Sequence, residues 1–398
     1  MKNLYTLLIL AFATLSLNAT VITSAANGNA TNPFTWNCTC IPMDGDTIII
    51  NHAITLDVDY AFTMGGIQVN ASGSITGNAN NRIFGVSGGY FINNGTVTVG
   101  YFIHNGGTVT NNGYITALGS ILLDQTVTTV NNGTMNAGDS TYVNTNATLQ
   151  NNNILDAGVC LSAGTINNVG TMNSLDMGNT GTFTHSASGN LTINGSLYNT
   201  GNVTLSGTTH ITGDIWNAEN MTANYFVTAQ TLYNGDTISG TAFFTNNGTV
   251  SLSNSLYNSE NIQGTGDFCV ADSSLNSGAI TGSVDICDQT GGGWDMNIGS
   301  EAGTVTHCAS GPCSIGISET PSVRMSIVPN PVHELLNITL SESQNGIVRV
   351  TDVTGRVVQE QQMNGNSVVL NVIALPNGIY SVTVIGNEQV STSRFVKD

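Results

Sequence analysis

The sequence predicts an all-β protein in which a right-handed parallel β-helix (a solenoid) is followed by a small C-terminal β-sandwich. Three observations support this fold class. A short motif returns roughly every 17 to 20 residues, apolar and polar residues alternate within each copy, and the composition is poor in charge and in helix formers. Self-similarity at such a period is typical of a solenoid, in which each repeat is one coil stacked on the last.

Each copy of the repeat opens with a corner and continues as a strand. Asn93-Asn94-Gly95-Thr96-Val97 returns as Asn111-Asn112-Gly113-Tyr114-Ile115, and exceptions to the period are interpreted as missed or short copies. The copies begin at Asn93, Asn111, Asn131, Asn151, Asn168, Asn199, Asn217, Asn234, Asn246, Asn258 and Asn276. Asn and Gly tolerate tight corners, and the alternation that follows has the period of a half-buried strand. A coil of this length has room for two or three strands.

A tripeptide within the repeats predicts a ladder of aromatic side chains. Leu-Tyr-Asn occurs at Leu197, Leu232 and Leu256, and these positions place tyrosines at the same corner of different coils. With neighbouring strands about 4.8 Å apart, some twelve or thirteen coils would form a rod on the order of 60 Å long.

Composition shifts divide the chain into five predicted parts. These are a signal peptide (1–19), an N-terminal cap (20–60), β-helix repeats (61–288), a C-terminal cap and linker (289–322), and a terminal domain (323–398). A cap is needed because the first coil otherwise leaves an open ladder edge.

The charge balance excludes several classes of partner. The net charge is −18, and only 8% of the residues are charged. Nineteen acids lie between Lys2 and Arg324, where Arg82 is the only basic residue. Such a surface cannot neutralise phosphates, so we expect no nucleic acid partner. Polyuronates and anionic membranes would also be repelled, which leaves neutral glycans, cations and basic proteins.

The amino terminus has the features of an export signal. Met1-Lys2-Asn3 supplies a short positive region, residues 4–17 form an apolar core, and Leu17-Asn18-Ala19 provides a small-residue cleavage site. No other stretch is long and apolar enough to span a bilayer, so the mature chain is predicted to have no transmembrane segment.

The stretch after residue 35 has the pattern of a solenoid cap. Trp36 is followed by Pro42 and then by Gly45-Asp46-Thr47-Ile48-Ile49-Ile50 and Leu56-Asp57. An aromatic residue, a proline turn and two β-rich runs suit a cap, and the pattern resembles the G8-type segment that opens some secreted bacterial β-helix proteins.

The last seventy-five residues carry an ordered set of motifs. They occupy 327–331, 336–338, 348–358, 375–384 and 394–398. The motif residues are Pro329, Asn330, Pro331, Asp352, Gly355, Arg356, Pro376, Gly378 and Tyr380. Alternating runs separated by Asp-x-x-Gly and Pro-Asn-Gly turns independently predict a small β-sandwich. The set resembles the type A C-terminal sorting domain of the type IX secretion system of Bacteroidetes. This resemblance implies recognition by the secretion machinery at the outer membrane, and then release or surface attachment.

Seven cysteines suit an oxidising compartment. Cys308 and Cys313 lie close together in a Gly-Pro loop, and we expect that they can pair. Cys269 and Cys287 are eighteen residues apart, about one coil, so they are predicted to stack and bridge.

The other cysteines predict no bridge or metal site. Cys38 and Cys40 are too close for a relaxed disulfide, although in a strand both would face the same side. Cys160 is interpreted as a small buried apolar residue. No CxxC spacing occurs, so we expect no metal and no cofactor.

Acidic pairs are the only candidates for metal binding or acid–base catalysis. Asp57 and Asp59 would share one face of a strand, and Asp44 and Asp46 flank a glycine; either pair suits Ca²⁺ or acid–base work. The simpler interpretation is that these acids keep an edge soluble and unpaired. The six histidines are scattered: His52, His104, His185, His210, His307 and His333.

Together these patterns predict an exported protein, secreted or held at the cell surface. We expect a non-enzymatic, adhesin-like or structural role, with glycans or host and matrix proteins as partners. The alternative is a polysaccharide-degrading β-helix enzyme that uses Asp carboxylates. A lyase acting beside a uronate needs Arg or Lys, and the repeats offer only Arg82. Acids clustered on one face would favour the enzyme, whereas dispersed acids would favour the binding or structural role.

Overall fold

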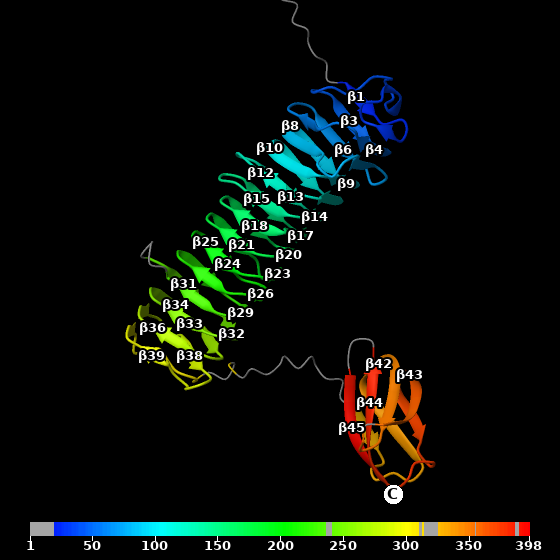
Figure 1. Ribbon diagram of the computed structural model, residues 1–398, viewed down its shortest axis with the longest axis vertical. Coiled ribbons are helices and arrows are strands. Elements are labelled where there is room, and N and C mark those ends of the chain that lie inside the picture. The colour runs from blue at the N-terminus through cyan, green and yellow to red at the C-terminus, as the bar shows by residue number, and fades with distance from the viewer. Residues whose placement is uncertain (1–19, 236–240, 310–312, 314–324, 355, 387–389) are drawn as a thin grey trace, which may run out of the picture. The chain divides into compact units, whose positions relative to one another are not determined.

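The structure is a computed structural model that describes residues 20–235, 241–309, 313, 325–354, 356–386 and 390–398. The predicted signal peptide and the motif residue Gly355 lie outside these residues. The chain divides into two units, Met1–Cys313 and Ser314–Asp398 (Figure 1). Each unit has its own apolar core.

The first unit is a parallel β-solenoid of about 13 turns, which confirms the predicted architecture. Its strands form three columns, each strand pairing in parallel with the coils before and after it (Figure 1). Two long strands, β8 (Ile83–Asn93) and β10 (Tyr101–Asn111), run through the first and second columns together. The first column otherwise contains β5 (Tyr60–Phe62), β12 (Ile121–Leu123), β15 (Ser140–Val143), β18 (Val159–Ser162), β21 (Met177–Asn179), β24 (Leu197–Asn199), β27 (Ile215–Asn217), β30 (Leu232–Asn234), β33 (Leu256–Asn258), β36 (Ser274–Asn276) and β39 (Met296–Asn297).

The second and third columns complete each coil. The second contains β1 (Val21–Thr23), β3 (Thr47–Ile50), β6 (Gly66–Val69), β13 (Thr128–Asn131), β16 (Thr148–Asn151), β19 (Thr165–Asn168), β22 (Thr182–His185), β25 (Asn202–Leu205), β28 (Asn220–Ala223), β31 (Phe243–Asn246), β34 (Asn261–Gly264), β37 (Ala279–Ile280) and β40 (Ser300–Glu301). The third contains β2 (Gly28–Asn29), β4 (Ala53–Leu56), β7 (Ser74–Gly77), β9 (Thr96–Val99), β11 (Tyr114–Ala117), β14 (Thr134–Ala137), β17 (Ile154–Asp156), β20 (Thr171–Ser174), β23 (Asn190–Ile193), β26 (Thr208–Ile211), β29 (Phe226–Ala229), β32 (Thr249–Leu252), β35 (Asp267–Val270) and β38 (Asp285–Asp288).

Alternation along the strands builds the solenoid core. In most four-residue strands the second and fourth side chains are buried, as in β16, where Leu149 and Asn151 point inward. Stacking repeats this pattern from coil to coil, so the buried side chains form one continuous apolar core. Phe84, Phe91 and Phe102 pack together within it near the N-terminal end.

Corner glycines allow the coils to approach closely. A Cβ on Gly113 would lie 2.1 Å from the carbonyl oxygen of Gly95, one coil earlier, and a Cβ on Gly133 would lie 2.1 Å from the oxygen of Gly113. No side chain fits at that distance, so these two positions require glycine, whereas the equivalent position of the next coil holds Asn153.

The asparagines that open the repeats are buried and bond to one another along the solenoid. Asn168 donates to His185 and Asn246 donates to the Asp267 carbonyl. Each of the other side-chain amides donates to the side-chain oxygen of the next asparagine at 2.7–3.0 Å. This chain satisfies amides that would otherwise be buried without partners.

The asparagines form two ladders, at two different corners. The first runs Asn93, Asn111, Asn131, Asn151 and Asn168, where the second column ends, and His185 follows it. The second runs Asn179, Asn199, Asn217, Asn234, Asn258, Asn276 and Asn297, where the first column ends. The interpretation of the long step as a missed copy is confirmed, because Asn179 opens a copy between Asn168 and Asn199, whereas the interpretation of the steps beside Asn246 as short copies is wrong. The long step after Asn168 marks the change of corner, and Asn246 belongs to the first corner.

A cap closes the N-terminal end of the solenoid. A 3-10 helix, η1 (Pro33–Thr35), begins after Asn32, whose side chain accepts a hydrogen bond from the Phe34 N–H. Trp36 follows and is buried, and its indole N–H donates to the carbonyl oxygen of Ala30 at 3.0 Å.

Cys38 and Cys40 form a disulfide, which the sequence interpretation did not expect. The interpretation assumed an extended strand, but these residues lie in a turn and bend after Trp36. Thr39 has a φ of 53°, in the left-handed region, and the two Cα atoms are 5.1 Å apart. A strand would separate them by about 6.6 Å.

The predicted pairing of the other four cysteines is wrong. Cys269 pairs with Cys313 and Cys287 with Cys308, with Cα separations of 5.0 and 4.4 Å. Cys269 and Cys287 do stack in neighbouring strands, as predicted. The chain after β40, however, returns to the third column, where Thr306 forms a parallel bridge with Asp285. The return brings a separate partner to each stacked cysteine. Cys160 is free and buried, as predicted.

The second unit is an antiparallel sheet of five strands, which confirms the predicted all-β C-terminal unit. The strands are β41 (Met325–Val328), β42 (Leu335–Thr351), β43 (Val357–Asn371), β44 (Gly378–Gly386) and β45 (Val390–Lys397). All five belong to one hydrogen-bonded sheet. The pairing of β42 with β43 shifts register between Thr339 and Gln344, and the unit has its own buried core.

Candidate functional site

A row of aromatic side chains lies on the outside of the first column. Tyr198, Trp216, Tyr233 and Tyr257 occupy the middle position of β24, β27, β30 and β33 and are register partners from coil to coil. Their ring centroids are 6.5, 3.9 and 5.2 Å apart, and neighbouring ring planes differ by 11 to 14°. We call these four residues the aromatic row. Tyr198 is 50% exposed and Trp216 is 42% exposed, so the row is available to a partner.

The aromatic row confirms the ladder predicted from the Leu-Tyr-Asn tripeptides and extends it. Leu197, Leu232 and Leu256 are buried beneath it, so the tyrosines that follow them point outward. Trp216 was missed because its tripeptide is Ile-Trp-Asn; an apolar-aromatic-Asn pattern would have found it.

Apolar residues continue the row along the same column. On the N-terminal side the outward positions are Leu122, Tyr142, Leu161 and Gly178, and on the C-terminal side they are Leu275 and Met296. Gly178, between Leu161 and Tyr198, interrupts the side chains. An uncovered apolar stripe on a soluble rod is typical of an interaction surface.

Hollows follow the aromatic row on the side where the first column ends. One of about 320 Å³ is lined by Tyr198, Asn199, Thr200, Trp216, Asn217, Ala218 and Gly235. Another of about 140 Å³ is lined by Tyr233, Asn234, Gly235, Tyr257, Asn258, Ser259, Leu275 and Ser277. They share Gly235 and together form what we call the groove. A third hollow of about 330 Å³ lies further along the column and includes Ile103, Leu122 and Tyr142.

The depth of the groove comes from the corner after the buried asparagines. Thr200, Ala218, Gly235, Ser259 and Ser277 each follow an asparagine of the second ladder. The backbone N–H groups at this corner donate to the carbonyl oxygen of the asparagine one coil earlier, at 2.8–2.9 Å, in Ala218, Gly235, Ser259 and Ser277. The side chains that follow the asparagines are small. The residues that precede Asn199, Asn217, Asn234 and Asn258 are the large side chains of the aromatic row. The groove therefore arises because large aromatic side chains stand next to small side chains along the same coils.

The groove is uncharged in an acidic surrounding. None of its lining residues carries a carboxylate or a cation at neutral pH. On the other side of the aromatic row, Asp214 accepts a hydrogen bond from the Thr231 N–H at 3.2 Å. Burial, followed by the charge of Asp214, raises the pKa of Tyr233, so its hydroxyl stays protonated. The groove can offer hydroxyl groups beside an apolar wall.

The acids near the N-terminal cap are engaged by the backbone and by threonines. Asp44 accepts hydrogen bonds from the N–H groups of Thr63 and Met64 at 2.8 and 2.9 Å and from the Thr63 hydroxyl. These bonds, led by the Thr63 hydroxyl, lower the pKa of Asp44. A carboxyl group that ionises more easily than usual is a poor general acid.

Asp57 and Asp59 do not act as a pair either. Asp57 accepts hydrogen bonds from the N–H and the hydroxyl of Thr31. Burial raises the pKa of Asp57, but the hydrogen bonds outweigh burial, and the net effect is a lowered pKa. Asp59 accepts from the Ile83 N–H and forms an ion pair with Arg82 at 3.5 Å. Asp46 accepts from the Met43 and Thr20 N–H groups. The four carboxylates therefore tie cap segments to the first coils.

Two histidines are buried in the solenoid. His104 bonds the Thr129 hydroxyl at 2.7 Å and the Gly107 carbonyl at 3.3 Å. His185 accepts from the Asn168 amide at 3.0 Å and donates to the Thr208 carbonyl at 3.1 Å. Burial lowers the pKa of both. Each is neutral at pH 7 and satisfied within the core.

The remaining histidines are dispersed. Their contacts are His52 with Ser24, His210 with Thr228, His307 with Glu301 and His333 with Asp398. Over the described part of the chain, no three His, Cys, Asp or Glu side chains gather so that they could hold a metal ion.

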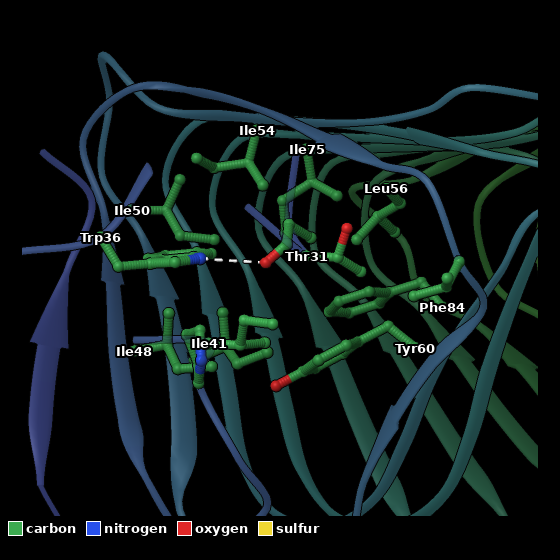
Figure 2. Close-up of a pocket in the computed structure, with 14 residues that line it drawn as sticks. Thr31, Trp36, Ile41, Ile48, Ile50, Ile54, Leu56, Tyr60, Ile75 and Phe84 are labelled. Atoms are coloured by element: carbon green, nitrogen blue, oxygen red, sulfur yellow. Dashed lines mark hydrogen bonds between the residues drawn. The ribbon is translucent and has the colours of Figure 1, made fainter. Parts of the chain in front are cut away.

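An apolar cavity of about 90 Å³ lies under the N-terminal cap. Figure 2 shows Trp36, Ile48 and Ile50 on one side of it, and Tyr60 and Phe84 on the other. Its walls are almost entirely apolar. Burial raises the pKa of Tyr60 to about 12, so this hydroxyl is no base. The cavity has no group that could orient or activate a substrate, and we interpret it as a packing gap between the cap and the first coils.

The sorting-motif residues hold the C-terminal sheet together. The Asn330 side chain accepts from the Val396 N–H at 2.8 Å and donates to the Arg394 carbonyl at 3.2 Å, which fixes the segment of Pro329 and Pro331 against β45. The Tyr380 hydroxyl donates to the carbonyl of Pro376 at 2.8 Å.

Asp352 organises the turn between β42 and β43. It accepts from the hydroxyl and N–H of Thr354 and from the N–H and guanidinium of Arg356. These bonds, led by the Thr354 hydroxyl, lower its pKa to about 2.

Three of the motifs meet at one end of the sheet. Thr351, before the Asp352 turn, pairs with Ser381, and Gly378 pairs with Lys397, which also bridges to Val332. A long β-solenoid that precedes a small, independently folded antiparallel sheet with these motifs has the organisation of an exported passenger with a terminal sorting signal.

The comparison with known families agrees with this class. Residues 326–398 match the family described as secretion system C-terminal sorting domain. This segment is a type IX sorting domain, and the protein is secreted or held at the cell surface. No curated protein matches the chain. Across the described residues, no helix has the length and apolarity to cross a membrane.

Proposed function

We propose that the solenoid is a non-enzymatic, adhesin-like binding rod, which the type IX machinery delivers to the cell surface or the medium. The observation that carries this proposal is the aromatic row with its adjoining groove, because no side chain of the described residues covers it. Aromatic side chains supply much of the energy of binding surfaces, and an uncovered row of them is unfavourable in water unless a partner uses it.

The arrangement of the acids supports a binding role over catalysis. The four acids considered for acid–base work accept hydrogen bonds from backbone N–H groups of the cap and first coils. None of the described residues that line the groove carries a carboxylate. The alternative, a polysaccharide-degrading enzyme, needs two carboxylates that face a substrate.

Export also involves sequence features at the N-terminal end. We propose that residues 1–19 act as a signal peptide for the inner membrane and that the protein comes from a member of the Bacteroidetes. The resemblance of the cap to the G8-type segment stays a prediction.

The proposal is tested with the full-length protein on an array of neutral glycans, acidic glycans and matrix proteins. We expect retention on at least one class, and less retention when Trp216 is replaced by Ala. In parallel, the soluble products of each glycan are measured by chromatography after incubation. Release of shorter sugars would favour the enzyme and contradict the proposal. Retention that Trp216→Ala leaves unchanged would move the binding site away from the aromatic row.

A further inference from the structure

We propose that the groove binds a single neutral, linear polysaccharide chain that lies parallel to the solenoid axis. This inference rests on the proposed binding function and names the chemistry and orientation of its ligand.

The direction of the groove sets the shape of the ligand. Its two hollows join at Gly235 and pass five coils, from Tyr198 to Leu275. Adjacent strands are about 4.8 Å apart, so the groove is roughly 19 Å long, and its walls repeat with every coil. A site that repeats along one axis suits a polymer with repeating units better than one compact molecule.

The lining sets the chemistry of the ligand. One wall is the aromatic row, and the opposite side carries the hydroxyls of Thr200, Ser259 and Ser277. A sugar ring presents C–H groups on its faces and hydroxyls around its rim, so it can meet both sides at once. Sites of this kind combine an apolar surface with a few polar groups that fix orientation.

Charge excludes the other polymers of similar shape. The groove has no cation, and Asp214 lies beside Tyr233, so a polyuronate, a sulfated glycan or a nucleic acid would be repelled. A second copy of this chain would bring a similarly acidic surface into contact. A neutral glycan meets no such barrier.

The backbone disfavours an extended peptide. Peptides usually bind a sheet by adding a strand to a free edge. Each strand beside the groove, from β24 to β36, already pairs with strands on both sides. A peptide in the groove would therefore leave its own N–H and C=O groups without sheet partners, whereas the hydroxyls of a glycan can bond side chains or water.

The test is calorimetric titration of the full-length protein with neutral oligosaccharides of two to eight sugars from several linkage series, with change in tryptophan fluorescence as a second readout. For one series we expect affinity to rise with each added sugar and to level off when the ligand fills the groove. Trp216→Ala should weaken binding at least tenfold, the size of an aromatic hot spot. Thr200→Trp should also weaken it, because the new side chain fills the groove from an exposed position.

Tyr114→Ala is the matched control, because Tyr114 is 60% exposed but lies in β11 of the third column. It should bind as the wild type does. Affinity independent of chain length, or equal loss in all three variants, would overturn the proposed site. If the protein binds peptides or matrix proteins but no neutral glycan, this inference fails and the binding role stands. If it binds none of these partners, both fail.

Discussion

Two neighbouring asparagines, Asn131 and Asn132, allow the contribution of the buried ladder to be measured. Asn131 is fully buried; it accepts from Asn111 at 2.8 Å and donates to Asn151 and to the Ile154 carbonyl, both at 2.7 Å. Asn132 belongs to an exposed ladder and makes two comparable bonds, to Asn112 at 2.9 Å and from Asn152 at 2.8 Å. Both residues are asparagines that bond asparagines of the neighbouring coils; Asn131 makes one further bond, to the Ile154 carbonyl, and it is buried whereas Asn132 is exposed.

Replacing Asn131 by Ala should cost far more than replacing Asn132. Three net hydrogen bonds of about 1 kcal/mol each are lost, and a buried acceptor on Asn151 loses its donor, which gives a total of about 3–5 kcal/mol. For Asn132→Ala water replaces the lost partners, and the cost should be about 0–1 kcal/mol.

The assay is hydrogen–deuterium exchange of both variants, together with thermal unfolding. A solenoid transmits stability mainly between neighbouring repeats, so we expect faster exchange in β10, β13 and β16 of the Asn131 variant and little change in coils far from it. Equal effects of the two substitutions would refute the reasoning, since burial would then not determine the strength of the ladder.

Three further outcomes follow from other features. Cys287→Ser combined with Cys308→Ser opens a covalent loop with a sequence separation of 21, which should cost about 3 kcal/mol and reduce the effect of reductant on thermal unfolding of the C-terminal coils to that of the remaining Cys269–Cys313 bond. Burial lowers the pKa of His185, so the unfolded chain binds a proton at this residue more readily than the folded chain does. The contribution of neutral His185 to the free energy of unfolding is therefore full above pH 6.5 and declines as the pH falls below it. His185→Asn, which extends the ladder from Asn168, should flatten the decline in denaturant titrations at several pH values. Asn330→Ala should loosen β45, lower the melting temperature of the C-terminal unit and reduce the amount of protein found outside the cell.

The solenoid could be predicted because the sequence pattern that specifies it lies within each repeat. The alternation within each copy decides which side chains point inward, and the corner Asn and Gly recur because they contact the coil before. The change of corner could not be predicted, because an Asn-x-Gly corner has the same sequence at either position. Only the pairing of Asn168 with His185, and of Asn179 with Asn199, separates the two ladders.

The disulfides and the groove depend on distant parts of the chain. Cys308 and Cys313 are close in sequence, but the return of the chain to the third column takes them to different strands. The groove needs small residues such as Ala218 and Gly235 beside Trp216, and each of these is unremarkable in the sequence alone. The motif residues of the C-terminal unit were predicted through a family resemblance, and the structure explains several of them as ties within the sheet.

The Cys269–Cys313 disulfide determines how a pulling force would enter the solenoid. Cys313 is covalently joined to β35, which lies before the last coils. If the C-terminal end of the protein is tethered, tension passes through this bond into β35 and leaves the strands from β36 to β40 unloaded. The final coils therefore cannot be peeled away one by one while the bond is intact. A rod attached in this way resists tension through a strand that is itself paired on both sides.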